Sequence, residues 1–126
     1  MKTIKKTCLF CLLVLCCFAL LGCGKKADEN KPVSEVQAEA ETMNAEQLRK
    51  IAMQYKDAVL AKSADIEKIT ATLKEIPVTE LLGNEAKGLK TEIDNLNKSI
   101  SDLTERFQIY YDKLKEKGGD LTGLEL

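Results

Sequence analysis

The sequence predicts an all-α protein folded as an antiparallel two-helix coiled-coil hairpin. Three observations predict this fold. Apolar residues recur at alternating spacings of four and three in two long runs, and Pro77 separates these runs. The 126 residues include three Phe, three Tyr and no Trp, which is too few aromatic residues for a large mixed core. A single small, regular body is therefore expected.

The first run predicts a helix at about residues 35–76. Its apolar positions follow a seven-residue repeat over four heptads, as in a coiled-coil seam. These seam positions are Leu48, Ala52, Tyr55, Val59, Lys62, Ile66, Ile69, Leu73 and Ile76. Two pairs, Ser34 with Gln37 and Asn44 with Gln47, are each typical of a helix start.

The second run predicts a helix at about residues 80–117 and continues the same repeat. Its seam positions are Leu82, Ala86, Leu89, Ile93, Leu96, Ile100, Leu103, Phe107, Tyr110 and Leu114. Pro77 lacks an amide hydrogen and disfavours the helical conformation in the residue before it, so the first helix should stop near Glu75 or Ile76. The short turn at about 77–80 makes the two helices antiparallel neighbours within residues 34–117. Gly118-Gly119 ends the second helix and begins a C-terminal tail, residues 118–126.

The predicted seam is narrow, and this leaves the state of assembly open. Residues beside it are mostly polar, which suits two strands better than a four-helix bundle. A lone pair of helices buries little surface, so self-association stays open. Lys62 lies at a seam position, either as a device that selects register or partner, or as a lysine whose stem packs while its ammonium reaches water; the second alternative is favoured.

The chain begins with a segment that has the order of a secretory signal. Lys2, Lys5 and Lys6 precede about 14 apolar residues from Cys8 to Leu21, followed by Gly22. This stretch is shorter than the roughly 20 residues that a membrane-spanning helix needs. We therefore expect residues 1–22 to be a signal peptide that is cleaved.

Leu20-Leu21-Gly22-Cys23 resembles the lipobox of bacterial lipoproteins. The resemblance implies that the Cys23 thiol receives a diacylglyceryl group, that cleavage precedes Cys23 and that the new amino terminus is acylated. Two acyl chains anchor a protein stably, since each buried methylene contributes about 0.8 kcal/mol. Residues 23–33 are then the lipidated cysteine and a flexible tether. Gly24, by the same resemblance, favours the outer membrane facing the periplasm where the cell has two membranes.

The other cysteines fit this interpretation. Cys8 and Cys11 form a C-x-x-C pair of the kind found in redox and zinc sites. They lie in an apolar run with Cys16 and Cys17, where cysteine acts as a small hydrophobic residue. All four would leave with the signal peptide.

Composition excludes several classes of function. The chain has no His, so it lacks the commonest metal ligand and the usual general base. Its formal net charge of −1 argues against a nucleic-acid partner. No nucleophile stands beside a base and no glycine-rich phosphate loop is present, so we expect no enzyme activity, no metal, no cofactor and no small-molecule substrate. Met53, Leu60 and Ile109 point away from the predicted seam and are the candidate partner-binding residues.

The function predicted from these features is that of a membrane-anchored envelope lipoprotein acting as a structural or protein-interaction coiled-coil module. One alternative is a homo-oligomeric structural lipoprotein resembling the murein lipoprotein, from which this chain departs by its Pro77 break and its final Leu126. A second alternative is a binding module that inhibits or chaperones an envelope partner. The expected partners are the membrane, through the lipid, and a protein or a second copy of the chain.

Overall fold

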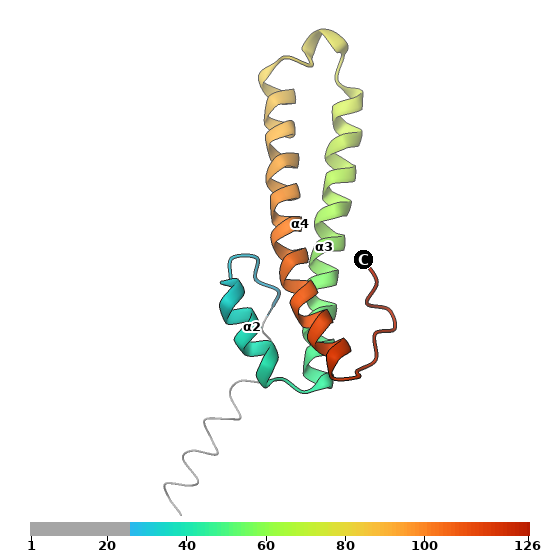
Figure 1. Cartoon of the computed structure of the whole chain (residues 1–126). Helices are drawn as coiled ribbons and strands as arrows, with labels where there is room; N and C mark the ends of the chain where they lie inside the picture. The colour runs from blue at the N-terminus through green and yellow to red at the C-terminus, as the bar shows by residue number, and fades with distance from the viewer. Residues whose placement is uncertain (1–25) are drawn as a thin grey trace, which may run out of the picture.

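The computed structural model describes residues 26–126, and within this range the chain is all-helical (Figure 1). Its elements are α2 (Val33–Thr42), α3 (Ala45–Glu75), the 3-10 turn η1 (Val78–Glu80) and α4 (Asn84–Glu116). α3 and α4 lie side by side, and η1 connects them at one end, the tip, residues 76–83 (Figure 1). The opposite end of this helical pair is the base. At about 1.5 Å per residue, the 31 residues of α3 extend about 46 Å.

The expected single helix at 35–76 is wrong, because the chain breaks between α2 and α3. Met43 and Asn44 are extended, with ψ angles of 146° and 171°. The Asn44 side chain accepts a hydrogen bond from the Gln47 amide, and the Gln47 side chain accepts one from the Asn44 amide. This reciprocal capping box starts α3, as the Asn44 and Gln47 pair predicts. The Ser34 pair is not a cap, since α2 follows Pro32 without a side-chain cap.

The break at Pro77 is confirmed, although the second helix begins later than residue 80. α3 ends at Glu75, and Ile76 before the proline is extended. The connection then makes one 3-10 turn, and α4 begins at Asn84 with Gly83 as its N-cap. The tip is therefore longer than the turn expected at 77–80.

The double glycine ends α4 as predicted. Gly118 has φ +68°, a left-handed conformation that glycine adopts without a steric penalty. The Gly119 amide donates to the Leu114 carbonyl at 2.9 Å, and the Gly118 amide donates to the Lys115 carbonyl at 3.0 Å. This Schellman arrangement turns the chain into the tail.

The main core lies in the half of the helical pair nearer the base. Seam residues of both helices are buried there, namely Leu48, Ala52, Tyr55, Val59, Leu103, Phe107, Tyr110 and Leu114. In the half nearer the tip Ala86 is buried, while the larger seam residues are half-buried, namely Ile66, Ile69, Leu73, Leu89, Ile93 and Leu96. The difference arises because further segments cover the pair near its base.

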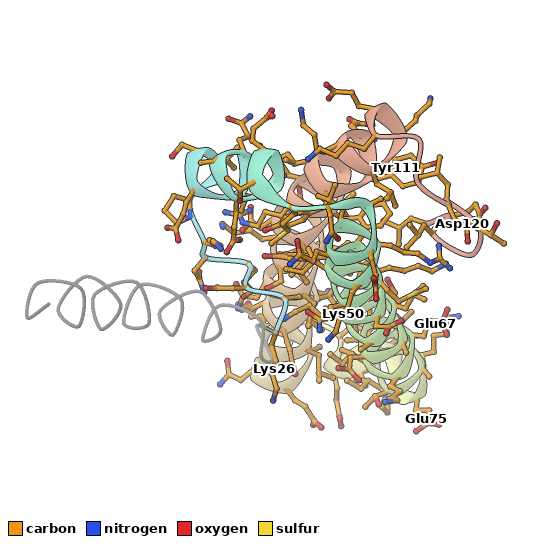
Figure 2. All side chains as sticks on the ribbon, turned by 90° about the horizontal axis from the view of Figure 1, so that it is seen from below. Lys26, Lys50, Glu67, Glu75, Tyr111 and Asp120 are labelled. Atoms are coloured by element: carbon orange, nitrogen blue, oxygen red, sulfur yellow. The ribbon has the colours of Figure 1, made fainter. Side chains whose placement is uncertain are left out.

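Two segments cover opposite sides of the pair near the base (Figures 1 and 2). Residues 26–42, which we call the strap, contain α2 and contribute buried Val36 and Ala40. The tail, residues 118–126, contributes buried Leu124. The structure therefore differs from the expected flexible tether at 23–33, because residues 26–32 pack against the helical pair through the polar contacts described below.

The predicted signal peptide, residues 1–22, and Cys23 lie outside the described residues. Among residues 26–126, no helix combines the length and the apolar character needed to cross a membrane.

Candidate functional site

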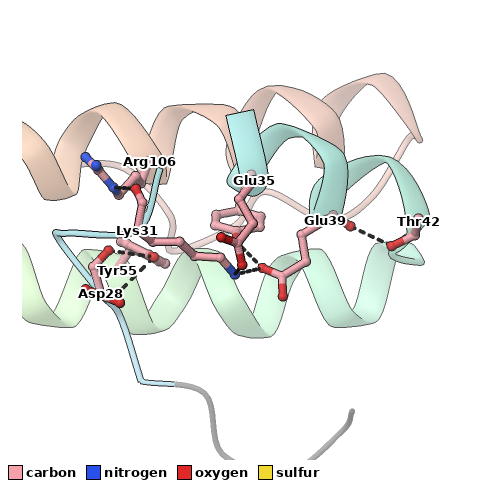
Figure 3. A network of polar contacts seen from close by, with 8 residues as sticks. Asp28, Lys31, Glu35, Glu39, Thr42, Tyr55 and Arg106 are labelled. Atoms are coloured by element: carbon pink, nitrogen blue, oxygen red, sulfur yellow. Dashed lines mark hydrogen bonds and ion pairs between the residues drawn. The ribbon is translucent and has the colours of Figure 1, made fainter. Parts of the chain in front are cut away.

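The strap is attached to the helical pair by a network of polar contacts (Figure 3). Tyr55, a seam residue of α3, contacts Asp28 twice. Its hydroxyl accepts a hydrogen bond from the Asp28 amide and donates one to the Asp28 carbonyl, both at 3.2 Å. A tyrosine hydroxyl needs such a partner when its ring is buried, so the strap completes the environment of Tyr55.

Glu39 of α2 lies at the centre of a second set of contacts. The Lys31 ammonium forms an ion pair and hydrogen bond with the Glu39 carboxylate, and the Tyr110 hydroxyl donates to the same carboxylate oxygen at 2.9 Å. Lys31 also lies 3.8 Å from Glu35. The Lys31 side chain is 12% exposed, so its charge is largely removed from water and depends on these carboxylates.

Arg106 of α4 is the buried charged residue of this site, with 8% of its surface exposed. Its Nε donates to the Lys31 carbonyl at 2.8 Å, and its Nη1 donates to the Asp102 carbonyl at 2.6 Å. The guanidinium therefore joins the strap to α4 through backbone oxygens, and the contact depends on the planar donor geometry of arginine.

Glu29 attaches the strap to both long helices. One of its carboxylate oxygens lies 3.2 Å from Lys62 Nζ on α3, and the other accepts a hydrogen bond from Ser99 of α4 at 2.9 Å. Lys62 thus meets a carboxylate of its own chain. Neither alternative predicted for Lys62 anticipates this intramolecular partner.

Burial changes the proton affinity of the two tyrosines. Desolvation raises the pKa of Tyr55 above its usual value of 10.0. Desolvation also raises the pKa of Tyr110, and the hydrogen bond to Glu39 and the negative charge of that carboxylate raise it further. The two rings lie 5.5 Å apart between centroids, so they also pack against one another.

A cleft with a volume of about 360 Å³ opens between the strap and the pair. It is lined by Lys26, Asp28, Asn30, Lys31, Pro32, Glu35, Glu39, Ile51, Tyr55 and Tyr110. Charges of both signs line it, and Lys31, Glu39 and both hydroxyls already bond within the chain. This arrangement stabilises a docked strap. Within residues 26–126 no group of three or more Cys, Asp or Glu side chains is arranged to hold a metal ion.

The tail docks on the opposite side of the pair. Arg49 donates to the Asp120 carbonyl at 2.8 Å, and Lys56 donates to the Gly123 carbonyl at 2.8 Å. Leu124 shares a shallow pocket with Phe107 and Tyr111. Tyr111 and Asp120 are seen from the base in Figure 2. The sequence predicts a C-terminal tail at residues 118–126, and the structure places Leu124 of this tail in the core.

The structure separates the three candidate partner-binding residues. Met53 and Ile109 are partly buried against the core, whereas Leu60 is 50% exposed. The two most exposed large aliphatic side chains lie instead at the tip, where Val78 is 85% exposed and Leu82 is 82% exposed. The heptad pattern assigns Leu82 to the seam, and the later start of α4 explains why it is exposed.

The comparisons with known proteins add no relative. No protein-family model matches the chain, and no curated protein or solved structure matches it.

Proposed function

We propose that this chain is a lipid-anchored protein of the bacterial envelope that acts as a structural or protein-interaction module. Its helical pair acts as an antiparallel coiled-coil hairpin and presents the tip away from the membrane. The resemblance of Leu20-Leu21-Gly22-Cys23 to a lipobox supports the anchor, with Cys23 as the acylated residue. In cells with two membranes, the protein is located on the periplasmic face of the outer membrane.

One structural observation carries the module part of the proposal. The strap and the tail cover the pair near its base, while the tip exposes Val78 and Leu82. The strap also brings the amino-terminal side of the described chain to the base half, since Lys26 lines the cleft with Ile51. An anchor at Cys23 therefore leaves the exposed aliphatic residues at the far end of the molecule, where a partner can reach them.

Metabolic labelling with a fatty acid tests the anchor. The native chain should take up label, and Cys23→Ser should lose it and keep residues 1–22. Cys17→Ser is the matched control, because it changes a cysteine of the same segment and should leave labelling unchanged. Label that persists in Cys23→Ser would contradict the proposal.

A homo-oligomeric structural lipoprotein is the second candidate function. The half-buried aliphatic residues of the tip half favour it, because a second copy would remove them from water. Light scattering on the detergent-solubilised chain gives the mass of the protein component. A monomer mass at all concentrations would exclude this candidate.

A binding module for an envelope partner is the third candidate, and exposed Leu60 and Leu82 favour it. Leu60→Glu and Leu82→Glu should each be compared with Lys68→Glu, which changes an exposed residue of α3. If co-purification of every partner from membranes is the same in all three variants, neither leucine contacts a partner.

A further inference from the structure

We propose that the strap, residues 26–42, is a clasp that opens and closes while the helical pair stays folded. Whether the clasp is open or closed determines the distance between the helical pair and the attachment point of the chain at Cys23. The attachment at Cys23 belongs to the proposed function, and only the distance part of this inference rests on it. The opening itself follows from the contacts of residues 26–126.

The start of α3 does not depend on the strap. Asn44 and Gln47 cap α3 reciprocally, and both residues lie beyond the strap. Met43 is extended, so a change of its backbone angles, with loss of the hydrogen bond from Lys117 Nζ to its carbonyl, moves α2 and leaves the Asn44 cap of α3 in place. Met43 is therefore the hinge of the clasp.

The strap has little stability of its own. α2 has ten residues, fewer than the roughly 12 to 15 at which an isolated helix becomes stable in water. It begins after Pro32 without a side-chain cap. Val36 and Ala40 are its buried apolar residues. Together with the partly buried Ala27, these side chains contribute far less burial than the seam of the pair, so the strap depends strongly on its polar contacts.

Lys31, Glu39 and Arg106 make largely buried contacts that hold the strap closed, and the remaining ion pairs of the strap are more exposed. Glu29 pairs with Lys62, and each side chain is 30% exposed. Glu41 pairs with Lys113 at 2.6 Å, and the Glu41 side chain is largely exposed. Exposed and half-exposed ion pairs contribute little to stability. Segments with few buried apolar contacts open with a lower free energy than the global unfolding of the protein.

Opening would change the reach of the chain. With the strap docked, residues 23–25 alone separate the lipidated cysteine from Lys26, and three residues span at most about 10 Å. With the strap released, residues 23–43 form the connection. Twenty-one residues span about 70 Å at most and about 25 Å on average as a flexible coil. The docked strap holds the base at the membrane surface, and release lets the pair move away from it.

Hydrogen exchange on the full chain in detergent micelles tests the opening. Amides of α2 should exchange at least about tenfold faster than amides at 48–59 of α3. Lys62→Glu places like charges at Glu29 and should speed exchange of α2 by a further three- to tenfold, roughly, with 48–59 unchanged. The double variant Glu29→Lys/Lys62→Glu restores opposite charges and should restore the native rate. Lys68→Glu, whose lysine pairs with Asp65 on its own helix, is the control.

Two results would overturn the clasp. Equal exchange rates for α2 and residues 48–59 in the native chain would mean that the strap leaves only on global unfolding. An equal acceleration of both segments in Lys62→Glu would mean the same.

Energy transfer between a dye at Thr79→Cys and labelled lipids tests the reach in vesicles. Lys62→Glu should lower the transfer efficiency relative to the native strap, and the charge-swapped double variant should restore it. Unchanged transfer despite faster exchange of α2 would overturn the distance part and leave the opening intact. Fatty-acid labelling of Cys23→Ser tests the attachment separately, so failure of the anchor and failure of the clasp give different results.

Discussion

Lys62 Nζ lies 3.2 Å from a carboxylate oxygen of Glu29, and this contact joins a seam position of α3 to the strap. A lysine at a position between two packed helices lowers the stability of the pair, because an apolar side chain would bury more surface there. Lys62 offsets part of this loss by holding the strap. Lys62 thus lowers the stability of the helical pair and stabilises the docked strap.

Lys62→Leu should separate these two effects. The variant adds apolar contact between α3 and α4 and should raise the free energy of unfolding of the pair by about 1 kcal/mol. It also removes the partner of Glu29, so amides of α2 should exchange faster. Urea unfolding followed by circular dichroism and hydrogen exchange measure the two effects. A slower exchange of α2 would contradict this account of Lys62.

Arg106→Met should destabilise the docked strap. The substitution keeps an extended apolar side chain and removes the bonds to the Lys31 and Asp102 carbonyls. The lost bonds come from a charged donor, so the expected loss is about 1 to 3 kcal/mol, measured by urea unfolding. Arg49→Met is the control on the tail side, where the more exposed pair with Asp120 should contribute less than about 1 kcal/mol.

Tyr110→Phe should reduce the sensitivity of the fold to high pH. The pKa of Tyr110 is raised in the folded state, so its stabilising contribution is present below the unfolded value of about 10 and is lost as the pH rises above it. The variant lacks this ionisation. Its free energy of unfolding should be about 1 to 2 kcal/mol lower at neutral pH because the bond to Glu39 is missing, and it should fall less steeply above pH 10. Parallel pH profiles of the two proteins would contradict the assignment.

The docking of the tail should weaken at low pH through Asp120. Hydrogen bonds from the side chain and backbone of Thr122, together with nearby Arg49, lower the pKa of Asp120 below its usual value of 3.8. A carboxylate with a lowered pKa stabilises the fold above its unfolded pKa, and this contribution is lost as the pH falls below that value. The methyl resonances of Leu124 should therefore change as the pH falls below about 4. Asp120→Asn should remove this dependence.

Substitution by alanine should change the stability in opposite directions at Gly119, just after α4, and at Gly88, inside α4. A Cβ at Gly119 would lie 2.1 Å from Leu114 Cδ1 and 3.3 Å from Ala45 Cβ, so buried Leu114 would have to move. Gly119→Ala should cost about 1 to 3 kcal/mol. Gly88, inside α4, has no atom within 4 Å of such a Cβ, so Gly88→Ala should stabilise the helix by about 0.5 to 1 kcal/mol. Thermal unfolding of both variants measures the difference.

The long helices could be predicted because their periodicity is strong. The repeat through Leu48 and Val59 gives the buried face of α3, and Pro77 and Gly118 give two of the helix ends. The seam positions do not account for Ile51 and Tyr111, which are also packed against the core.

The strap could not be predicted in the same way. GKKADENKP, residues 24–32, has the composition of a tether, and nothing in its pattern indicates that Asp28 meets Tyr55 or that Glu29 meets Lys62. These contacts join residues far apart in the sequence and depend on the path of the backbone. The capping pair at Asn44 was the one local signal of a break, because it marks a second helix start inside a continuous helical pattern.

The strap and the tail together have a steric consequence for crowding on a surface. The strap and the tail cover opposite sides of the helical pair near the base. A neighbouring molecule therefore cannot pack against the aliphatic residues of the pair there. Such packing is possible only between Lys62 and the tip, where neither the strap nor the tail covers the pair. A second molecule that packs on this protein would therefore contact the half nearer the tip and be held off from the half nearer the base.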